Sequence, residues 1–202
     1  MINIAANVLI SSVHWRLFYF QEPMTEYKSL PNYFEFYHIP VAFNPDLNAI
    51  KLQFYANSKK YHPDFFANES DEKQQEVLEL STLNNKAYQV LTSPQRRLKY
   101  VLELLGIVET DEGYKLPQDF LMDMMDINEA LMDLEFEPDA AKINQLKEDV
   151  AEIAKGLDHE LEHLTQAYDT SNTDKESVLA TIKDIFYRQK YVARIQEKLQ
   201  QP

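Results

Sequence analysis

The sequence predicts an all-α protein, and three observations lead to that fold class. The 202 residues include only three glycines, Gly106, Gly113 and Gly156. Apolar residues recur with the 3.6-residue period of an amphipathic helix, and no run alternates convincingly with the period of two that marks a strand. Hydrophobic residues make up 45% of the chain and charged residues 26%, which is typical of a soluble globular protein.

Four helices are expected in the first half of the chain, at residues 32–37, 46–61, 71–91 and 95–105. Asp46 can cap the second helix, and Pro63 ends it because proline has no N–H to donate and clashes with the preceding turn. Ser93 and Pro94 end the third helix, and the fourth helix begins directly after them. Gly106 then suits the C-terminal cap of the fourth helix.

Three longer helices are expected in the second half, at residues 117–136, 139–168 and 174–199. Short turns between them predict an antiparallel three-helix bundle, and Pro117 suits the first turn of its first helix. The chain therefore divides into an N-terminal extension, a first helical domain, a linker and the bundle, at residues 1–31, 32–106, 107–116 and 117–202. A translation start at Met24 would remove most of the extension, so residues 1–23 are expected to lie outside the core fold.

The composition excludes several classes of function. Because the chain has no cysteine, it cannot use a thiol nucleophile, a disulfide scaffold or a thiolate-held metal site. Its three glycines cannot build a glycine-rich phosphate loop. The net charge is −13, and residues 107–202 hold 22 acids against ten bases, which repels nucleic acids and anionic membranes. No apolar run is long enough to span a membrane. We expect a cytoplasmic protein with no cofactor, no nucleic-acid partner and no membrane partner.

The tripeptide His62-Pro63-Asp64 lies in the loop between the second and third expected helices. Pro63 stiffens this turn and reduces the entropy that is lost when a partner docks. Asp64 offers a carboxylate for charge-assisted hydrogen bonds from a partner's arginine or lysine, and His62 adds a directional donor or acceptor. The helix before the loop carries three lysines that suit an acidic partner surface: Lys51, Lys59 and Lys60.

This setting resembles a J-domain, the module that activates DnaK-type chaperones. The resemblance rests on a short NYF helix before the tripeptide, the pair Phe65-Phe66 after it, and the run LNNKAYQVLTSPQRRLKY in the next helix. It implies that His62, Pro63, Asp64 and the three lysines bind the chaperone. One departure is Phe65, which stands where many J-domains have a lysine, and this implies weaker electrostatic steering.

Residues 32–200 as a whole resemble the HscB family (Jac in yeast), co-chaperones of iron–sulfur cluster assembly. The J-domain-like part runs directly into PQRRLKYVLELLG and then into an acidic bundle that opens PQDFLMDMMDINEALMDLE. The resemblance implies that the protein is not an enzyme. It implies instead a co-chaperone that stimulates the ATPase of a DnaK/HscA-type chaperone and delivers an IscU-type scaffold. A J-domain co-chaperone with a different client is the alternative.

The expected helix at residues 117–136 carries two apolar stripes. At 100° per residue, the core stripe contains Phe120, Met124, Ile127, Leu131 and Leu134. The second stripe contains Leu121, Met122, Met125 and Met132, and Asp126, Glu129 and Asp133 border it or lie in it. Eight acids and no base lie between residues 117 and 141. A methionine-rich stripe edged with carboxylates favours a docking face for a basic client. The alternative is that both stripes are buried within the chain.

The HscB resemblance maps the family's scaffold-binding face onto this second stripe. It implies apolar contacts at Leu121, Met122 and Met125, and acidic contacts at Asp126, Glu129 and Asp133. On the last helix, the family's aromatic contact aligns best with Tyr187, and Phe186 is the competing choice. By angle, Tyr187 lies opposite the expected core stripe of that helix, which favours an outward contact.

The segment His159-Glu160-Leu161-Glu162-His163 matches the H-E-x-x-H pattern of zinc metalloproteases. Two histidines one helical turn apart could bind zinc, with Glu160 as the base. However, no histidine follows His163, and the segment lies inside a long charged bundle helix. The interpretation is two exposed or half-buried histidines and no metal site, with a metalloprotease kept as the third class of function.

Overall fold

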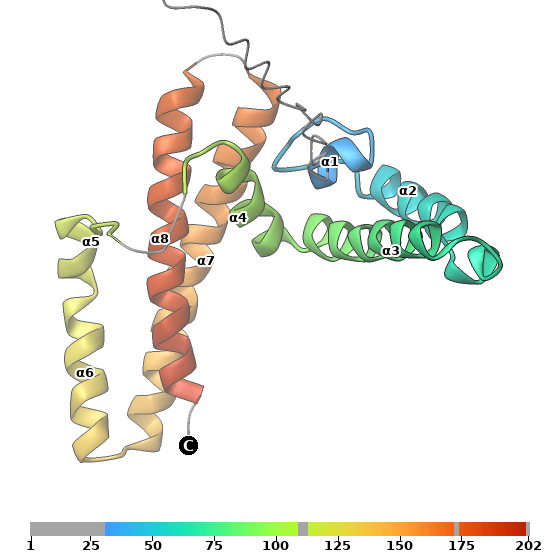
Figure 1. Ribbon diagram of the computed structural model, residues 1–202. Coiled ribbons are helices and arrows are strands. Elements are labelled where there is room, and N and C mark those ends of the chain that lie inside the picture. The colour runs from blue at the N-terminus through green and yellow to red at the C-terminus, as the bar shows by residue number, and fades with distance from the viewer. Residues whose placement is uncertain (1–30, 109–112, 172–173, 201–202) are drawn as a thin grey trace, which may run out of the picture. The chain divides into compact units, whose positions relative to one another are not determined.

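The computed structural model describes residues 31–108, 113–171 and 174–200 (Figure 1). The N-terminal extension, including the expectation about Met24, lies outside these residues. Every regular element within them is a helix, which confirms the all-α fold class. Within the same ranges, none of the helices is both long and apolar enough to cross a membrane.

The first half of the described chain forms a helical hairpin with two short flanking helices. Its elements are α1 (Tyr33–Phe36), α2 (Leu47–Lys60), the 3₁₀ helix η1 (Pro63–Phe66), α3 (Asp71–Thr92) and α4 (Pro94–Leu104). Helices α2 and α3 lie side by side and are joined through η1 (Figure 1). The Asn84 side chain on α3 donates to the Phe54 carbonyl and the Ser58 hydroxyl on α2, at 3.1 and 3.0 Å. These bonds, together with apolar packing, fix the hairpin that carries the loop.

The second half forms the expected bundle. Its elements are α5 (Gln118–Asp123), α6 (Met125–Phe136), α7 (Ala140–Thr170) and α8 (Lys175–Gln200). The prediction of one continuous helix at residues 117–136 is wrong, because the helix breaks at Met124 into α5 and α6. The Asn128 side chain donates to the Met124 carbonyl at 2.6 Å, which ties the break to the first turn of α6. Sequence periodicity cannot detect such a break because the apolar spacing continues across it.

Two apolar cores lie along the described chain. The core of α5–α8 contains Phe120, Ile127, Val150 and Ile195, with Leu131 and Leu134 packed against it. The core of α1–α4 is built around Phe34, Ile50 and Leu102. It also takes in Ile182 and Phe186 from α8, which are 0% and 7% exposed. The first four helices and the bundle therefore share buried side chains.

The loop before α2 is joined to the end of α7 by polar contacts around Phe43. The Asp169 carboxylate accepts from the backbone N–H groups of Phe43 and Asn44, at 3.0 and 2.7 Å. The Arg97 Nε donates to the Phe43 carbonyl at 2.7 Å. Burial lowers the pKa of the Arg97 guanidinium and the nearby Asp169 charge opposes that shift, so arginine keeps its charge. The Phe43 ring meets the Tyr168 ring edge-on at 5.2 Å.

Candidate functional site

The His62-Pro63-Asp64 tripeptide is exposed at the tip of the α2–α3 hairpin. His62 is the N-cap of η1, and its Nδ1 accepts from the backbone N–H of Asp64 at 3.3 Å. The side chains of His62 and Asp64 are 51% and 85% exposed. Because Nδ1 is used inside the loop, the Nε2 edge of the imidazole is the one that can meet a partner. Neither side chain belongs to a core cluster, so both are available for binding.

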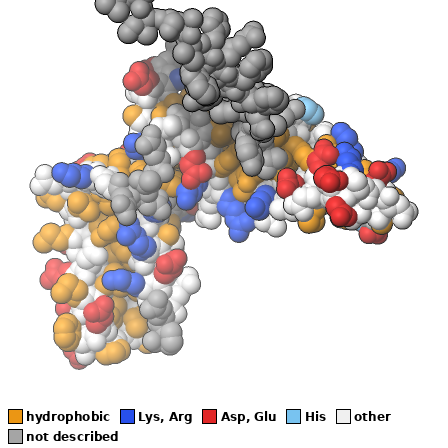
Figure 2. Space-filling view, in the orientation of Figure 1, with side chains coloured by type: hydrophobic (Ala, Val, Ile, Leu, Met, Phe, Trp, Pro, Cys, Tyr) orange, Lys and Arg blue, Asp and Glu red, His pale blue; other side chains and the backbone are white. Residues whose placement is uncertain are grey.

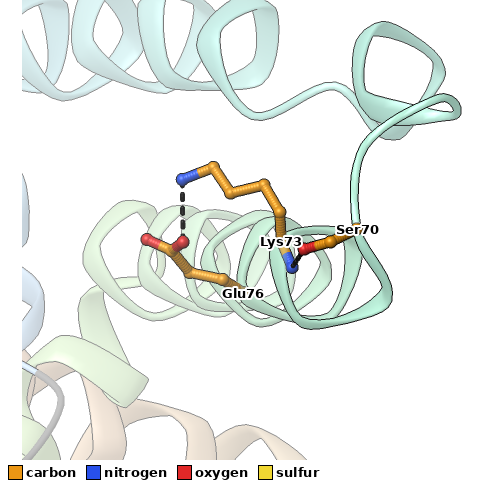
Figure 3. Close-up of polar contacts among 3 residues, drawn as sticks. All are labelled: Ser70, Lys73 and Glu76. Atoms are coloured by element: carbon orange, nitrogen blue, oxygen red, sulfur yellow. Dashed lines mark hydrogen bonds and ion pairs between the residues drawn. The ribbon is translucent and has the colours of Figure 1, made fainter.

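The chain that returns from this loop to α3 is held by side-chain hydrogen bonds. Ser70 caps α3 by accepting from the backbone N–H of Lys73 at 3.4 Å, and Lys73 pairs with Glu76 at 2.7 Å (Figure 3). The Gln74 side chain donates to the carbonyls of Ala67 and Glu69, at 3.3 and 2.9 Å. An exposed ion pair contributes little stability, so the cap and the glutamine are the main restraints on the loop. They restrain the stretch that joins the tripeptide to α3.

The outward face of α2 combines lysines with apolar side chains that the sequence interpretation did not assign. Lys51 and Lys59 are exposed, while the Lys60 ammonium lies over the Tyr61 ring at 5.0 Å. Leu52 and Tyr55 are 72% and 60% exposed. The spacing of 52, 55 and 59 places Leu52, Tyr55 and Lys59 on one helix face. The signal was available in the sequence, because Leu52 and Tyr55 fall between Lys51 and Lys59.

The two stripes of α5 and α6 separate as the helix angles predict. On the inner side, Phe120, Met124 and Ile127 are buried. On the outer side, Leu121, Met122 and Met125 are 43%, 66% and 65% exposed. The three expected acidic positions are also exposed: Asp126, Glu129 and Asp133. The described chain therefore leaves the second stripe uncovered, which the docking-face interpretation requires.

Contacts with α8 fix which side of α6 faces outward. The Asn128 side chain bridges to the Tyr191 hydroxyl on α8 at 2.7 Å. The buried Phe120 ring meets the Tyr191 ring edge-on at 5.8 Å, and the Arg188 guanidinium lies 5.2 Å from its centroid. Arg188 is in turn paired with Asp184 at 2.6 Å. Rotation of α6 would break these contacts, so the outward direction of Met125 is set by the bundle.

The expectation that Tyr187 points outward beside this stripe is wrong. Its ring is partly buried, lies against the core of α1–α4 and stacks on Tyr114 with centroids 4.1 Å apart. The angular argument failed because α8 has apolar neighbours on two sides, the bundle and the first four helices. Phe186, the competing choice, is buried at 7% exposure. Phe186 is therefore closed to a client, and Tyr187 is only partly exposed.

Tyr114, which the sequence interpretation treated as part of a linker, is the residue that covers Tyr187. Its hydroxyl donates to the Asp184 carboxylate at 2.7 Å. Partial burial and this hydrogen bond to a carboxylate raise the pKa of Tyr114 to about 12, so the hydroxyl stays protonated at neutral pH. The segment before α5 is thus fastened to α8. Nothing in the sequence indicated this contact, because a single tyrosine in a polar stretch belongs to no repeating apolar pattern.

The two histidines of the H-E-x-x-H segment lie on the exposed side of α7. His159, Glu160 and His163 are all exposed. Across residues 31–108, 113–171 and 174–200, no group of three or more acidic or histidine side chains is arranged to hold a metal ion. Since a catalytic zinc site needs three protein ligands, this segment offers only two of them.

Two family models match the chain, one on each half. A DnaJ domain matches residues 33–100, and an HSCB C-terminal oligomerisation domain matches residues 116–200. Among curated relatives, the co-chaperone protein HscB homologs of two Vibrio cholerae serotype O1 strains are each 38% identical over 101 residues. That alignment takes in 50% of this chain and 59% of each relative, so the chain spans less than two thirds of their length.

Solved structures give a longer match. The chaperone HscB from Vibrio cholerae is 26% identical with a TM-score of 0.59, and the match covers 84% of this chain and 95% of that one. The human co-chaperone protein HscB is 25% identical with a TM-score of 0.63, and the match covers 85% of this chain and 81% of that one.

A helical hairpin with an exposed His-Pro-Asp loop, matched by the DnaJ model, defines a J-domain protein. The second match, over the acidic bundle, narrows the class. Together the two matches and the similar proteins identify the chain as an HscB-type J-domain co-chaperone.

Proposed function

We propose that this protein is a non-enzymatic co-chaperone with two binding surfaces. Its J-domain stimulates ATP hydrolysis by a DnaK/HscA-type chaperone through His62, Pro63 and Asp64, assisted by Lys51, Lys59 and Lys60. Its bundle holds an IscU-type scaffold on the outer stripe of α5 and α6. The scaffold contacts are Leu121, Met122, Met125, Asp126, Glu129 and Asp133.

The observation that supports this proposal is the exposure of both surfaces on one chain. The tripeptide is open at the tip of the hairpin, and the outer stripe is open while its opposite side is buried. Several large apolar side chains exposed together on a protein usually mark a partner site. Joining the two surfaces on one chain raises the effective concentration of client at the chaperone.

Affinity capture from native lysate, followed by identification of what is bound, tests the proposal. Recovery of both a DnaK/HscA-type chaperone and an IscU-type scaffold is expected. Recovery of the chaperone with a different client would instead favour a J-domain co-chaperone of another process. A chain that captures neither would contradict the proposal.

The chaperone surface on α2 is expected to combine charge with apolar contact. The Lys51→Gln/Lys59→Gln variant should bind the chaperone less tightly at low salt and show a shallower loss of affinity as salt rises, because screening acts on the charges. The Leu52→Ala/Tyr55→Ala variant should lose affinity at every salt concentration and keep the slope of the parent. Titration calorimetry between low and high ionic strength measures both. A parent affinity that does not change with salt would contradict the role of the lysines.

A further inference from the structure

The exposed apolar line on α6 continues beyond the residues that the family resemblance assigns. Met132 and Phe136 are 61% and 85% exposed, and Phe136 is the most exposed of the large apolar side chains among the described residues. At 100° per residue, both lie within about 20° of Met125. Within α6, from Met125 to Phe136, the line is roughly 17 Å long at about 1.5 Å per residue. Figure 2 shows hydrophobic atoms along this outer edge, with acidic atoms between them.

Carboxylates accompany this line over its whole length. Glu129, Asp133 and Asp126 lie about 40° to 100° around the helix from Met125, all on the same side, while Glu135 lies about 80° away on the other side. No lysine or arginine occurs between residues 117 and 141. An occupant of the line must therefore offer apolar side chains along its length and basic side chains along one edge. A second copy of this chain fits poorly, because the same stretch of that copy offers no lysine or arginine to pair with the carboxylates.

We propose that the scaffold-binding surface includes Met132 and Phe136, so that the client is held along the full length of α5 and α6. The occupant is a client protein with an elongated apolar surface flanked by basic residues. This inference rests on the proposed function of the bundle, and it adds Met132 and Phe136 to the scaffold-binding surface. The hydrogen bond between Asn128 and Tyr191 holds α6 against α8, and Met132 and Phe136 are exposed in the free protein.

The test compares three double variants for binding to a purified IscU-type scaffold by titration calorimetry. Met132→Ala/Phe136→Ala is expected to weaken binding at least about tenfold, because truncated interface anchors carry most of an interface's affinity. Leu121→Ala/Met125→Ala is expected to do the same. The matched control is Leu47→Ala/Leu78→Ala, which removes apolar side chains that are 52% and 53% exposed on the J-domain and should change affinity by less than about twofold. All three should keep the melting temperature of the parent.

The outcomes separate this inference from the proposed function. If Leu121→Ala/Met125→Ala weakens binding and Met132→Ala/Phe136→Ala does not, the extended surface is wrong and the scaffold function stands. If neither variant weakens binding, both are wrong. Sedimentation velocity tests whether a second copy of the chain occupies this surface instead. The inference would be overturned if the parent self-associates and Met132→Ala/Phe136→Ala alone abolishes that association while it keeps full scaffold binding. Met132 and Phe136 would then belong to an interface between two copies.

Discussion

Replacing His62 with glutamine, or Asp64 with asparagine, is expected to abolish stimulation of the chaperone ATPase. Both side chains are exposed, and the contacts between the two residues are local: the Asp64 N–H donates to the His62 Nδ1, and the Asp64 carboxylate lies 3.7 Å from the same nitrogen. The Asp64→Asn change removes the charge that a partner's cation would pair with, while His62→Gln removes the imidazole edge that faces outward. Neither change reaches a core, so the melting temperature should stay within a few degrees of the parent.

Single-turnover ATP hydrolysis by the chaperone measures this effect. The matched control is Glu69→Gln, which also neutralises an exposed carboxylate in the same loop and should stimulate as the parent does. Full stimulation by both the His62 and the Asp64 variants would refute the chaperone-activating role of the tripeptide. A loss of stimulation that Glu69→Gln shares would point to general electrostatic attraction rather than to the tripeptide.

The two sides of α6 are expected to respond in opposite ways to truncation. Leu121→Ala/Met125→Ala should lower scaffold affinity at least about tenfold with little change in stability, because both side chains are exposed and separate from the core. Ile127→Ala should lower the free energy of unfolding by roughly 2–5 kcal/mol through a cavity in the bundle core, and its folded fraction should still bind. Urea denaturation and titration calorimetry on the same samples measure both quantities.

The double variant leaves Tyr187 unchanged. Since its ring packs on Tyr114 and against the core of α1–α4, Tyr187→Ala should mainly destabilise the fold.

A Leu121→Ala/Met125→Ala variant that unfolds at a much lower urea concentration than the parent would contradict the separation of the two stripes. An Ile127→Ala variant that is as stable as the parent would also contradict this separation.

Most helices and both sides of α6 could be predicted because local patterns determine them. Caps at Asn32, Asp46 and Ser70 and the period of the apolar residues depend only on neighbours in sequence. The position of Tyr187 depends on what lies beyond its own helix, and a single-helix angle treats α8 as having one apolar side. It has two, so the residue assigned to solvent lies instead against α1–α4. Contacts such as that between Tyr114 and Asp184 join positions far apart in sequence, and no repeating sequence pattern predicts them.

The sharing of Ile182 and Phe186 between α8 and the core of α1–α4 bears on how freely this J-domain could be moved between proteins. A fragment that ended at Gly106 would lack both side chains and would turn the surfaces they cover toward water. Burying a side chain of this size is worth roughly 1.5–3 kcal/mol, against a total stability of about 5–15 kcal/mol for a typical domain. The Asp169 contacts to Phe43 and Asn44 would be lost as well. Recombination that exchanged the J-domain alone would therefore start from a weakened fold, and the two halves are constrained to evolve as a pair.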